Sequence, residues 1–458
     1  MQEHDRLEGF AQALCKAQGS DAVSSDSLVA EVPTTTRRPL QFAYFCLILF
    51  MLVYYARPED WIPGVNVIPL AKTTGALLIL AFLLSLGQVR GRVPREVIYL
   101  VLLLLQFFLA VPFSPVWKGG AFWNTLNFAK VVPVVFVLVW VLNTLSRWRR
   151  LIFLQTVCVT IIAVVAVWKG RSTHGRLVGV LYGNFDNPND LACQIAIFLP
   201  FCLGFLLTTR NRIWKLAWAF AIVLMTYALL LTGSRGGFLA LLVMFGACIW
   251  EFAIKGRYRF LLVFAVAGIL CLGLFSGVVL KRFGAISNEK EDPAAFESAQ
   301  TRRDVLLNAL GTTVGHPLFG VGAGNFEILS GSWHSAHNTF LEMSADGGLP
   351  ALILYLMILW RAFKNVRTVK RYKGEAFEHR LWAKALQASL LAFLVASCFA
   401  SEAYQYFTYF LVANTSALLL ITQKKQALER RSAIADRSAP DEGGYEQPSQ
   451  SEPAWFPS

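Results

Sequence analysis

The sequence predicts an all-α polytopic membrane protein, and three observations support this fold class. Hydrophobic residues make up 55% of the chain and charged residues 16%, whereas an ordinary soluble domain has about a quarter charged residues. Apolar runs long enough to cross a bilayer follow one another along most of the chain. Lys and Arg gather in alternate loops between these runs. Backbone groups at bilayer depth must pair within their own segment, so we expect the runs to be helices.

We expect about twelve transmembrane helices, with one large polar loop at 281–338. Polar stretches at 1–38 and 423–458 are expected to be disordered tails, which leaves 39–422 as the membrane domain. The expected spans share continuous apolar character, and they are 39–56, 68–87, 96–115, 121–143, 151–168, 188–208, 213–232, 236–254, 259–280, 339–362, 381–400 and 403–422.

The basic residues orient the chain, because the short cytoplasmic loops of membrane proteins carry an excess of Lys and Arg. Both termini are therefore expected in the cytoplasm and the loop 281–338 outside it. The net charge of +13 fits this orientation and does not indicate a nucleic-acid partner. The basic clusters share one side of the expected spans, and they lie at 90–95, 147–150, 210–215, 255–259, 361–373 and 424–431.

One arginine stands between two expected spans, in the stretch LLLTGSRGGFLALL. Gly233, Gly236 and Gly237 predict a tight reversal and a close approach of the backbone there, which puts Arg235 at the outer face of the membrane. The arginine is either an interfacial residue that reaches lipid headgroups or a ligand of an anion. The glycines favour the anion ligand, because they would leave space around the guanidinium.

Two adjacent arginines, Arg302 and Arg303, open a predicted amphipathic helix in the large loop. A capping box is expected to start this helix at Thr301, and the sequence Gly-His-Pro at 315–317 is expected to end it. Such a helix could lie on the outer leaflet of the membrane. From the spacing alone, a basic surface helix that touches lipid phosphate is an equally good interpretation.

The loop at 169–187 is an exception to the charge rule, because it holds Arg171 and Arg176 on the outer side. A role as additional anion ligands would explain the exception. The helix that follows this loop is expected to be capped by Asn187 and to begin with Pro188.

His334 and His337 are three residues apart at the end of the large loop. No third ligand stands at a recognisable spacing, and the chain has no CxxC pair, so we expect no metal site.

A polar stripe enters the span that begins near residue 339. His337 is followed by Asn338, Glu342 and Asp346, and the last three are four residues apart, which places them on one face of a helix. Ionisable groups in a membrane helix are functional candidates, because burying them is costly. Alternatively, they line a wet vestibule and are merely solvated. The sequence GGLP at 347–350 is expected to loosen or kink this helix.

Four segments, in this order, resemble the O-antigen ligase family of bacterial inner-membrane glycosyltransferases. They are GNFDNPNDLA, LLTGSRGG, RRDVLLNALGTTVGHPLFGVGAGNF and HNTFLEMSADGGLPALILYL, and together they cover about 170–360. The N-terminal YYARPEDWIPG is also similar to a branch of the family that is associated with exopolysaccharide and exosortase loci.

The resemblance implies a GT-C-like fold and an inner-membrane enzyme that needs no metal or other cofactor. Its donor would be a glycan on undecaprenyl diphosphate, and its acceptor a hydroxyl of lipid A–core, of a glycan or of a protein. By motif, Arg235, Arg302 and His337 are the expected catalytic residues, and a shift of one residue in the motif would put Arg303 in the place of Arg302. The other expected site residues would bind the diphosphate (Arg303, Arg171 and Arg176) or support the site (Asn189, Asn338, Glu342 and Asp346).

The residue chemistry agrees with this role. Fixed arginines would bind a diphosphate and stabilise its departure, and a neutral histidine would accept the proton of the acceptor hydroxyl. A polysaccharide polymerase of the same family would share these parts. A transporter or flippase of lipid-linked sugars should instead show charges near mid-membrane, where Lys72, Lys130 and Lys384 are the few candidates.

Overall fold

The structure is a computed structural model of the chain. The chain divides into two units after residue 41, and only Leu40 and Gln41 of the first unit are described. The second unit holds the helical bundle. The residues that the structure describes are 40–62, 64–65, 69–88, 93–169, 172–173, 176–179, 187–254, 293–330, 336–372, 374 and 377–438.

Eight helical segments of the described part are long and apolar enough to cross a membrane. This confirms the all-α polytopic class, and the chain is a multi-pass membrane protein. The segments are α2 (Gln41–Ala56) with α3 (Pro58–Trp61), α5 (Arg95–Ala110) with η3 (Val111–Phe113), α6 (Lys118–Ala129) with α7 (Val131–Val141), α8 (Leu145–Lys169), α9 (Pro188–Thr208), α10 (Arg212–Leu231), α11 (Arg235–Cys248) running into the π-helix η4 (Ile249–Ile254), and α15 (Thr339–Lys370).

The expected count of twelve spans stays a prediction. The expected span at 68–87 is the shorter helix α4 (Leu70–Leu83), and the one at 259–280 lies outside the described residues. Helices α16 (Phe377–Ala396) and α17 (Tyr406–Ser438) lie where the last two spans were expected. The other elements are the long helix α13 (Pro293–Gly315) and four short ones: η2 (Leu86–Gln88), β1 (Ser172–Thr173), β2 (Arg176–Leu177) and α14 (Phe326–Leu329).

Two expected element ends were wrong. Helix α17 continues to Ser438, beyond the expected end at 422, because the residues after 422 are mostly good helix formers and Lys425 pairs with Glu429 one turn later (3.6 Å). Helix α13 begins at Pro293, so Thr301 is inside the helix and does not cap it. Its expected end was right, since the helix stops at Gly315.

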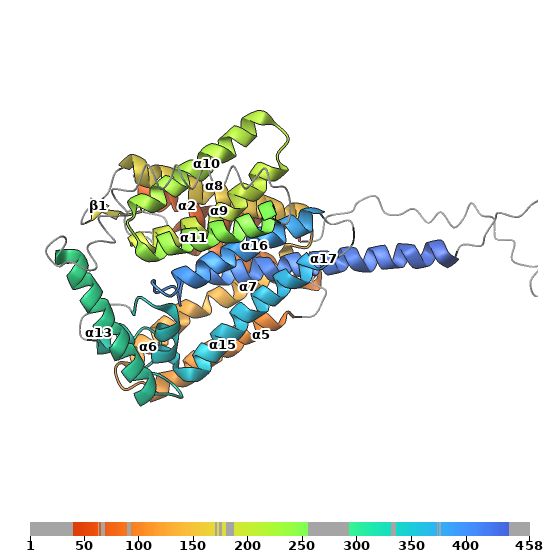
Figure 1. Cartoon of the computed structure of the whole chain (residues 1–458). Coiled ribbons are helices and arrows are strands. Elements are labelled where there is room, and N and C mark those ends of the chain that lie inside the picture. The colour runs from red at the N-terminus through yellow and green to blue at the C-terminus, as the bar shows by residue number, and fades with distance from the viewer. Residues whose placement is uncertain are drawn as a thin grey trace, which may run out of the picture. The chain divides into compact units, whose positions relative to one another are not determined.

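Helix α9 lies at the centre of the bundle. It is buried along its whole length from Leu191 to Phe205, and it packs against α8, α10, α11 and α16 (Figure 1). Helix α15 packs against α5, α13, α16 and α17. Helices α9, α11, α15 and α17 all begin at the same end of the bundle, which we call the site end.

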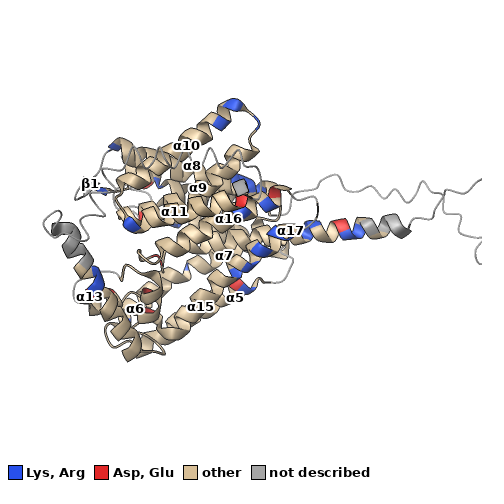
Figure 2. Cartoon of the chain, in the orientation of Figure 1, with Lys and Arg blue, Asp and Glu red and all other residues tan. Residues whose placement is uncertain are grey.

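Lys and Arg residues gather mainly at the opposite end of the bundle, toward the ends of α15 and α17 (Figure 2). A second, smaller group lies at the site end, near β1, at the start of α11 and on α13 (Figure 2). The second group is the unusual one, because it stands apart from the basic clusters that orient the chain.

Helix α15 is broken at Gly348, which has φ 77° and ψ 179°. The break confirms the kink expected from the GGLP sequence. Pro350 has no N–H, so the carbonyl of Asp346 lacks its helical donor. The N–H of Gly322 donates to this carbonyl instead (2.9 Å).

Residues 316–326, which we call the glycine-rich strap, cover the rest of the break. The N–H of Val321 donates to the carbonyl of Ala345 (2.9 Å), and the N–H of Leu349 donates to the carbonyl of Pro317 (2.7 Å). The strap therefore satisfies the backbone groups that the break frees, as a membrane helix requires.

Replacing Gly348 with alanine should destabilise the protein by more than about 1 kcal/mol. The positive φ suits only glycine, and a Cβ there would lie 2.6 Å from the carbonyl carbon of Leu318. Gly311→Ala is the matched control, because this helical glycine has open space around it, and alanine there should gain about 0.5–1 kcal/mol. Thermal unfolding of the purified protein measures both changes, and equal melting temperatures for the two variants would contradict the strained break.

Candidate functional site

The turn between α10 and α11 presents Arg235 at the site end. Gly233 has φ 58°, so the predicted tight reversal is present. Ser234 caps α11, with its Oγ accepting from the N–H of Gly237 (3.1 Å). Arg235 is the first residue of α11, and its side chain is half-buried.

The two glycines after Arg235 confirm the expected close approach of the backbone, but not the expected space around the guanidinium. A Cβ at Gly236 would lie 2.4 Å from Cβ of Phe399, and one at Gly237 would lie 2.5 Å from Cβ of Ala192. The glycines thus allow close packing against the α16–α17 loop and against α9. They do not clear space for the guanidinium.

Helix α13 brings a second arginine to Arg235. Arg302 is half-buried, whereas Arg303 is exposed. Burial lowers the pKa of Arg302, and the neighbouring positive charge of Arg235 lowers it further. Of the two adjacent arginines, the structure therefore places Arg302 at the site.

Neither Arg235 nor Arg302 makes a hydrogen bond or an ion pair with any residue in the described part of the chain. Two half-buried cations thus lie close together without an acidic partner there. Such a pair is costly unless an anion joins it.

Arg176 lies in the small β1–β2 hairpin near this turn, but two of its donors are used inside the protein. Its Nε donates to the carbonyl of Thr232 (2.9 Å), and its Nη2 donates to Oδ1 of Asn189 (2.9 Å). Asn187 caps α9 as expected, with Pro188 as the first helical residue. The other arginine of this loop, at position 171, lies outside the described residues, as does the histidine at 334.

His337 precedes α15 and is half-buried. Its φ is 48°, a left-handed conformation that is uncommon outside glycine. Asn338 is the helix cap, since its Oδ1 accepts from the N–H groups of Phe340 (3.0 Å) and Leu341 (3.1 Å). The strained histidine is therefore held directly before a firmly capped helix.

The start of α15 is tied to the loop between α16 and α17. Thr339 donates its N–H to the carbonyl of Ser397 (2.9 Å) and its hydroxyl to the carbonyl of Ala400 (2.8 Å). Phe399 of the same loop packs against Gly236. This loop thus connects the turn of Arg235 with the segment of His337.

Asp346 does not face a wet vestibule but joins three segments inside the protein. Its carboxylate accepts from the N–H groups of Gly324 (2.8 Å) and Phe326 (3.0 Å) and from the hydroxyl of Tyr404 (2.8 Å). The side chain is 1% exposed. Asp346 therefore anchors the glycine-rich strap to α15. Glu342 is also buried, and its Oε2 has no hydrogen-bond partner among the described residues.

Glu402, in the α16–α17 loop, is a buried acid that the sequence pattern did not single out. The residue is 0% exposed, and neither carboxyl oxygen has an N–H or O–H partner in the described part of the molecule. Burial raises the pKa of Glu402 well above its usual range, the nearby Asp190 and Glu342 carboxyls raise it further, and the neighbouring Cys193 thiol opposes this rise. The available sequence signal was a lone acid directly at the end of a span.

Glu402→Gln should stabilise the protein increasingly as pH rises above the ordinary pKa of Glu, about 4.3. The unfolded chain loses the Glu402 proton first, so the stability of the wild type falls until the pH reaches the raised folded pKa. Glutamine removes this dependence. Melting temperatures of both proteins from about pH 4 to pH 9 test it, with Asp304→Asn on the exposed face of α13 as control. A difference between Glu402→Gln and the wild type that does not grow with pH would contradict it.

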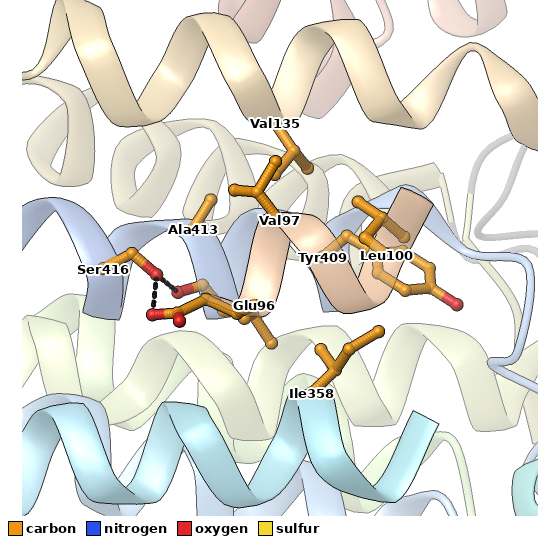
Figure 3. A pocket seen from close by; sticks show the side chains of 9 residues that line it. Glu96, Val97, Leu100, Val135, Ile358, Tyr409, Ala413 and Ser416 are labelled. Atoms are coloured by element: carbon orange, nitrogen blue, oxygen red, sulfur yellow. Dashed lines mark hydrogen bonds between the residues drawn. The ribbon is translucent and has the colours of Figure 1, made fainter. Parts of the chain in front are cut away.

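A cavity lies farther along the bundle, between α5, α7, α15 and α17 (Figure 3). Its only charged lining group, Glu96, accepts from the hydroxyl of Ser416 (2.7 Å) and lies 3.5 Å from Nε of Arg361. The rest of the lining is mainly aliphatic (Figure 3). The cavity therefore has no free cation for a diphosphate. Glu96 instead links α5 to α17 through Ser416 and to α15 through Arg361. Of the lysines considered for transport, Lys130 is exposed and donates to Oδ1 of Asn127, and Lys384 donates to the carbonyl of Glu251.

Among the described residues, no group of three or more His, Cys, Asp or Glu side chains could hold a metal ion.

Comparison with known proteins gives a family match. A family model described as O-antigen ligase matches residues 220–356, which include Arg235, Arg302 and His337. Over these residues, the match supports the family resemblance that the sequence motifs predicted. No curated protein matches the sequence.

A solved structure is also similar to the chain, and it is described as "Structural coordination of polymerization and crosslinking by a peptidoglycan synthase complex". The matched chain is 14% identical, with 72% of this chain and 97% of that chain covered and a TM-score of 0.40. A score this low does not establish a shared fold.

Proposed function

We propose, on the premise that residues 220–356 form an O-antigen ligase domain, that the protein transfers a glycan from undecaprenyl diphosphate to an acceptor hydroxyl. The observation that carries this proposal is the pair of Arg235 and Arg302. Both are half-buried, they lie close to each other, and neither has an acidic partner in the described part of the chain. A diphosphate supplies the missing charge, and guanidinium groups match its oxygens.

In this reaction the bond between the sugar anomeric carbon and the diphosphate oxygen breaks, and the diphosphate leaves with the electron pair. The acceptor oxygen forms the new bond to the same carbon. Arg235 and Arg302 stabilise the charge that develops on the leaving group. His337 accepts the proton of the acceptor hydroxyl. No metal or cofactor takes part, so activity should persist in the presence of a chelator.

The test uses purified full-length protein in vesicles that contain undecaprenyl diphosphate carrying a labelled glycan. Lipid A–core, a glycan and a protein are offered in turn as acceptors. We expect the label to move to one acceptor and free undecaprenyl diphosphate to appear. A product that carries several repeats would favour the polymerase of the same family. Label that crosses the membrane on unchanged lipid would favour a flippase and overturn the proposal.

The site end should face the outside of the inner membrane, with both termini in the cytoplasm and the large loop at 281–338 in the periplasm. A cysteine at exposed Asn308 of α13 should react with a membrane-impermeant thiol reagent in spheroplasts, whereas one at exposed Ser432 of α17 should react only after permeabilisation. The background replaces Cys398, which is exposed, and Cys15 and Cys271. The other cysteines are buried. Reversed labelling would contradict the orientation.

A further inference from the structure

We propose that Arg176 is a positioning residue that fixes the turn carrying Arg235, and that it is not itself a ligand of the donor diphosphate. This inference rests on the proposed function of Arg235. It assigns Arg176 a role different from the one that its charge and its loop suggested.

The hydrogen bonds of the Arg176 guanidinium are the first observation behind this role. Nε and Nη2 form one edge of the guanidinium fork, the kind of edge that can bind a phosphate with two parallel hydrogen bonds. Here this edge is divided between two neutral acceptors, the carbonyl of Thr232 and Oδ1 of Asn189, both at 2.9 Å. The edge therefore holds two protein segments together, the end of α10 and the start of α9.

Asn189 passes this connection on to the residue before Arg235. Its Oδ1 accepts a second hydrogen bond, from the hydroxyl of Ser234 (2.8 Å), so both lone pairs of the oxygen are used. The Ser234 oxygen in turn accepts from the N–H of Gly237 (3.1 Å) and caps α11. Arg176 is thus linked to the turn on both sides of Gly233.

Burial makes this network costly to break. Thr232 is 0% exposed, Ser234 4% and Asn189 7%. Water cannot readily replace a lost partner at such positions, so an unsatisfied group would shift the turn. Arg235 is the next residue along the chain, and a shift of about 1 Å at a positioning residue can cost about a hundredfold in rate.

The test measures binding of undecaprenyl diphosphate to the purified full-length protein in lipid nanodiscs. Asn189→Ala keeps every arginine but removes the acceptor shared by Arg176 and Ser234, and we expect it to weaken binding about tenfold or more. Asn189→Asp keeps that acceptor and should restore most of the affinity. Lys169→Ala removes an exposed charge next to the same hairpin and should bind as the wild type does.

A double-mutant cycle separates positioning from direct contact. In an Arg235→Lys background, Arg176→Gln should weaken binding little further, because Arg176 acts only by positioning the Arg235 guanidinium, which this background lacks. A direct ligand would instead weaken binding by the same factor in both backgrounds, and this result would overturn the inference. So would wild-type binding by Asn189→Ala. If Asn189→Ala does not fold, Ser234→Ala provides the same comparison.

Different results would contradict this inference and the proposed function. If Arg235→Ala binds undecaprenyl diphosphate as tightly as the wild type, the donor site itself is wrong. If Arg235→Ala loses binding while Asn189→Ala and Ser234→Ala keep it, only the positioning role of Arg176 is wrong.

Discussion

Arg235→Ala should abolish glycan transfer and release the lipid donor, with the folded protein present at normal levels. The side chain lies at the start of α11 beside Arg302, and neither has an acidic partner in the described part of the chain. Its forked donors would make two charge-assisted hydrogen bonds to a diphosphate. We expect the affinity for undecaprenyl diphosphate to fall by roughly a hundredfold or more.

The same change should leave stability unchanged or raise it. Removing Arg235 relieves the repulsion between two neighbouring cations, so the melting temperature of Arg235→Ala without donor should equal or exceed that of the wild type. Loss of binding together with retained stability is the signature of a ligand site. A clear fall in melting temperature would indicate a structural role.

Two further variants sharpen this prediction. Arg235→Lys should rescue poorly, because one ammonium group does not replace the guanidinium fork. Arg302→Ala should also lose the donor, whereas Arg303→Ala should lose at most a few-fold, since Arg303 is exposed. Full activity of Arg235→Lys would favour a simple headgroup anchor. Equal losses for Arg302→Ala and Arg303→Ala would contradict the assignment of Arg302.

Replacing His337 should separate chemistry from binding. General-base catalysis contributes roughly a hundredfold to ten-thousandfold, so His337 variants should lose transfer in that range and keep the affinity for undecaprenyl diphosphate. Arg235→Ala loses both. Turnover with the purified protein and binding of undecaprenyl diphosphate to the same sample measure the two quantities.

The backbone at His337 dictates which substitution to use. With φ at 48°, alanine would add backbone strain to the loss of the ring. Asparagine tolerates this conformation better and cannot act as a base near neutral pH, so His337→Asn is the cleaner variant and His337→Gly its backbone control. Transfer at the wild-type rate by His337→Asn would remove the histidine from the mechanism.

The sequence predicted the fold class, most spans and the kink at GGLP because each has a local cause. Continuous apolar runs identify membrane helices, and a proline without an N–H breaks one. The choice between Arg302 and Arg303 had no such local cause. It depends on which face of α13 packs against α15, where Val305 and Ala309 join the core, and neighbouring residues on a helix point in different directions.

Hydrogen bonds between residues far apart in the chain could not be predicted from the sequence either. Asp346 was expected to support the site or to be merely solvated, yet its partners lie at least 20 residues away in the chain, at Gly324, Phe326 and Tyr404. The bonds of Arg176 to Thr232 and Asn189 likewise depend on how three elements meet. The predicted roles of Arg235, Arg302 and His337 remain predictions that the variants above test.

The glycine-rich strap has a consequence for how this protein can vary. The strap supplies the missing backbone donors of α15 and is anchored by Asp346. A change in the conformation of the loop therefore requires a matching change in the first part of the helix. Val305 and Ala309 of α13 pack in the same core as Val321 and Ala345. A chimaera that took α13 from a relative would therefore have to bring the strap and the broken helix with it.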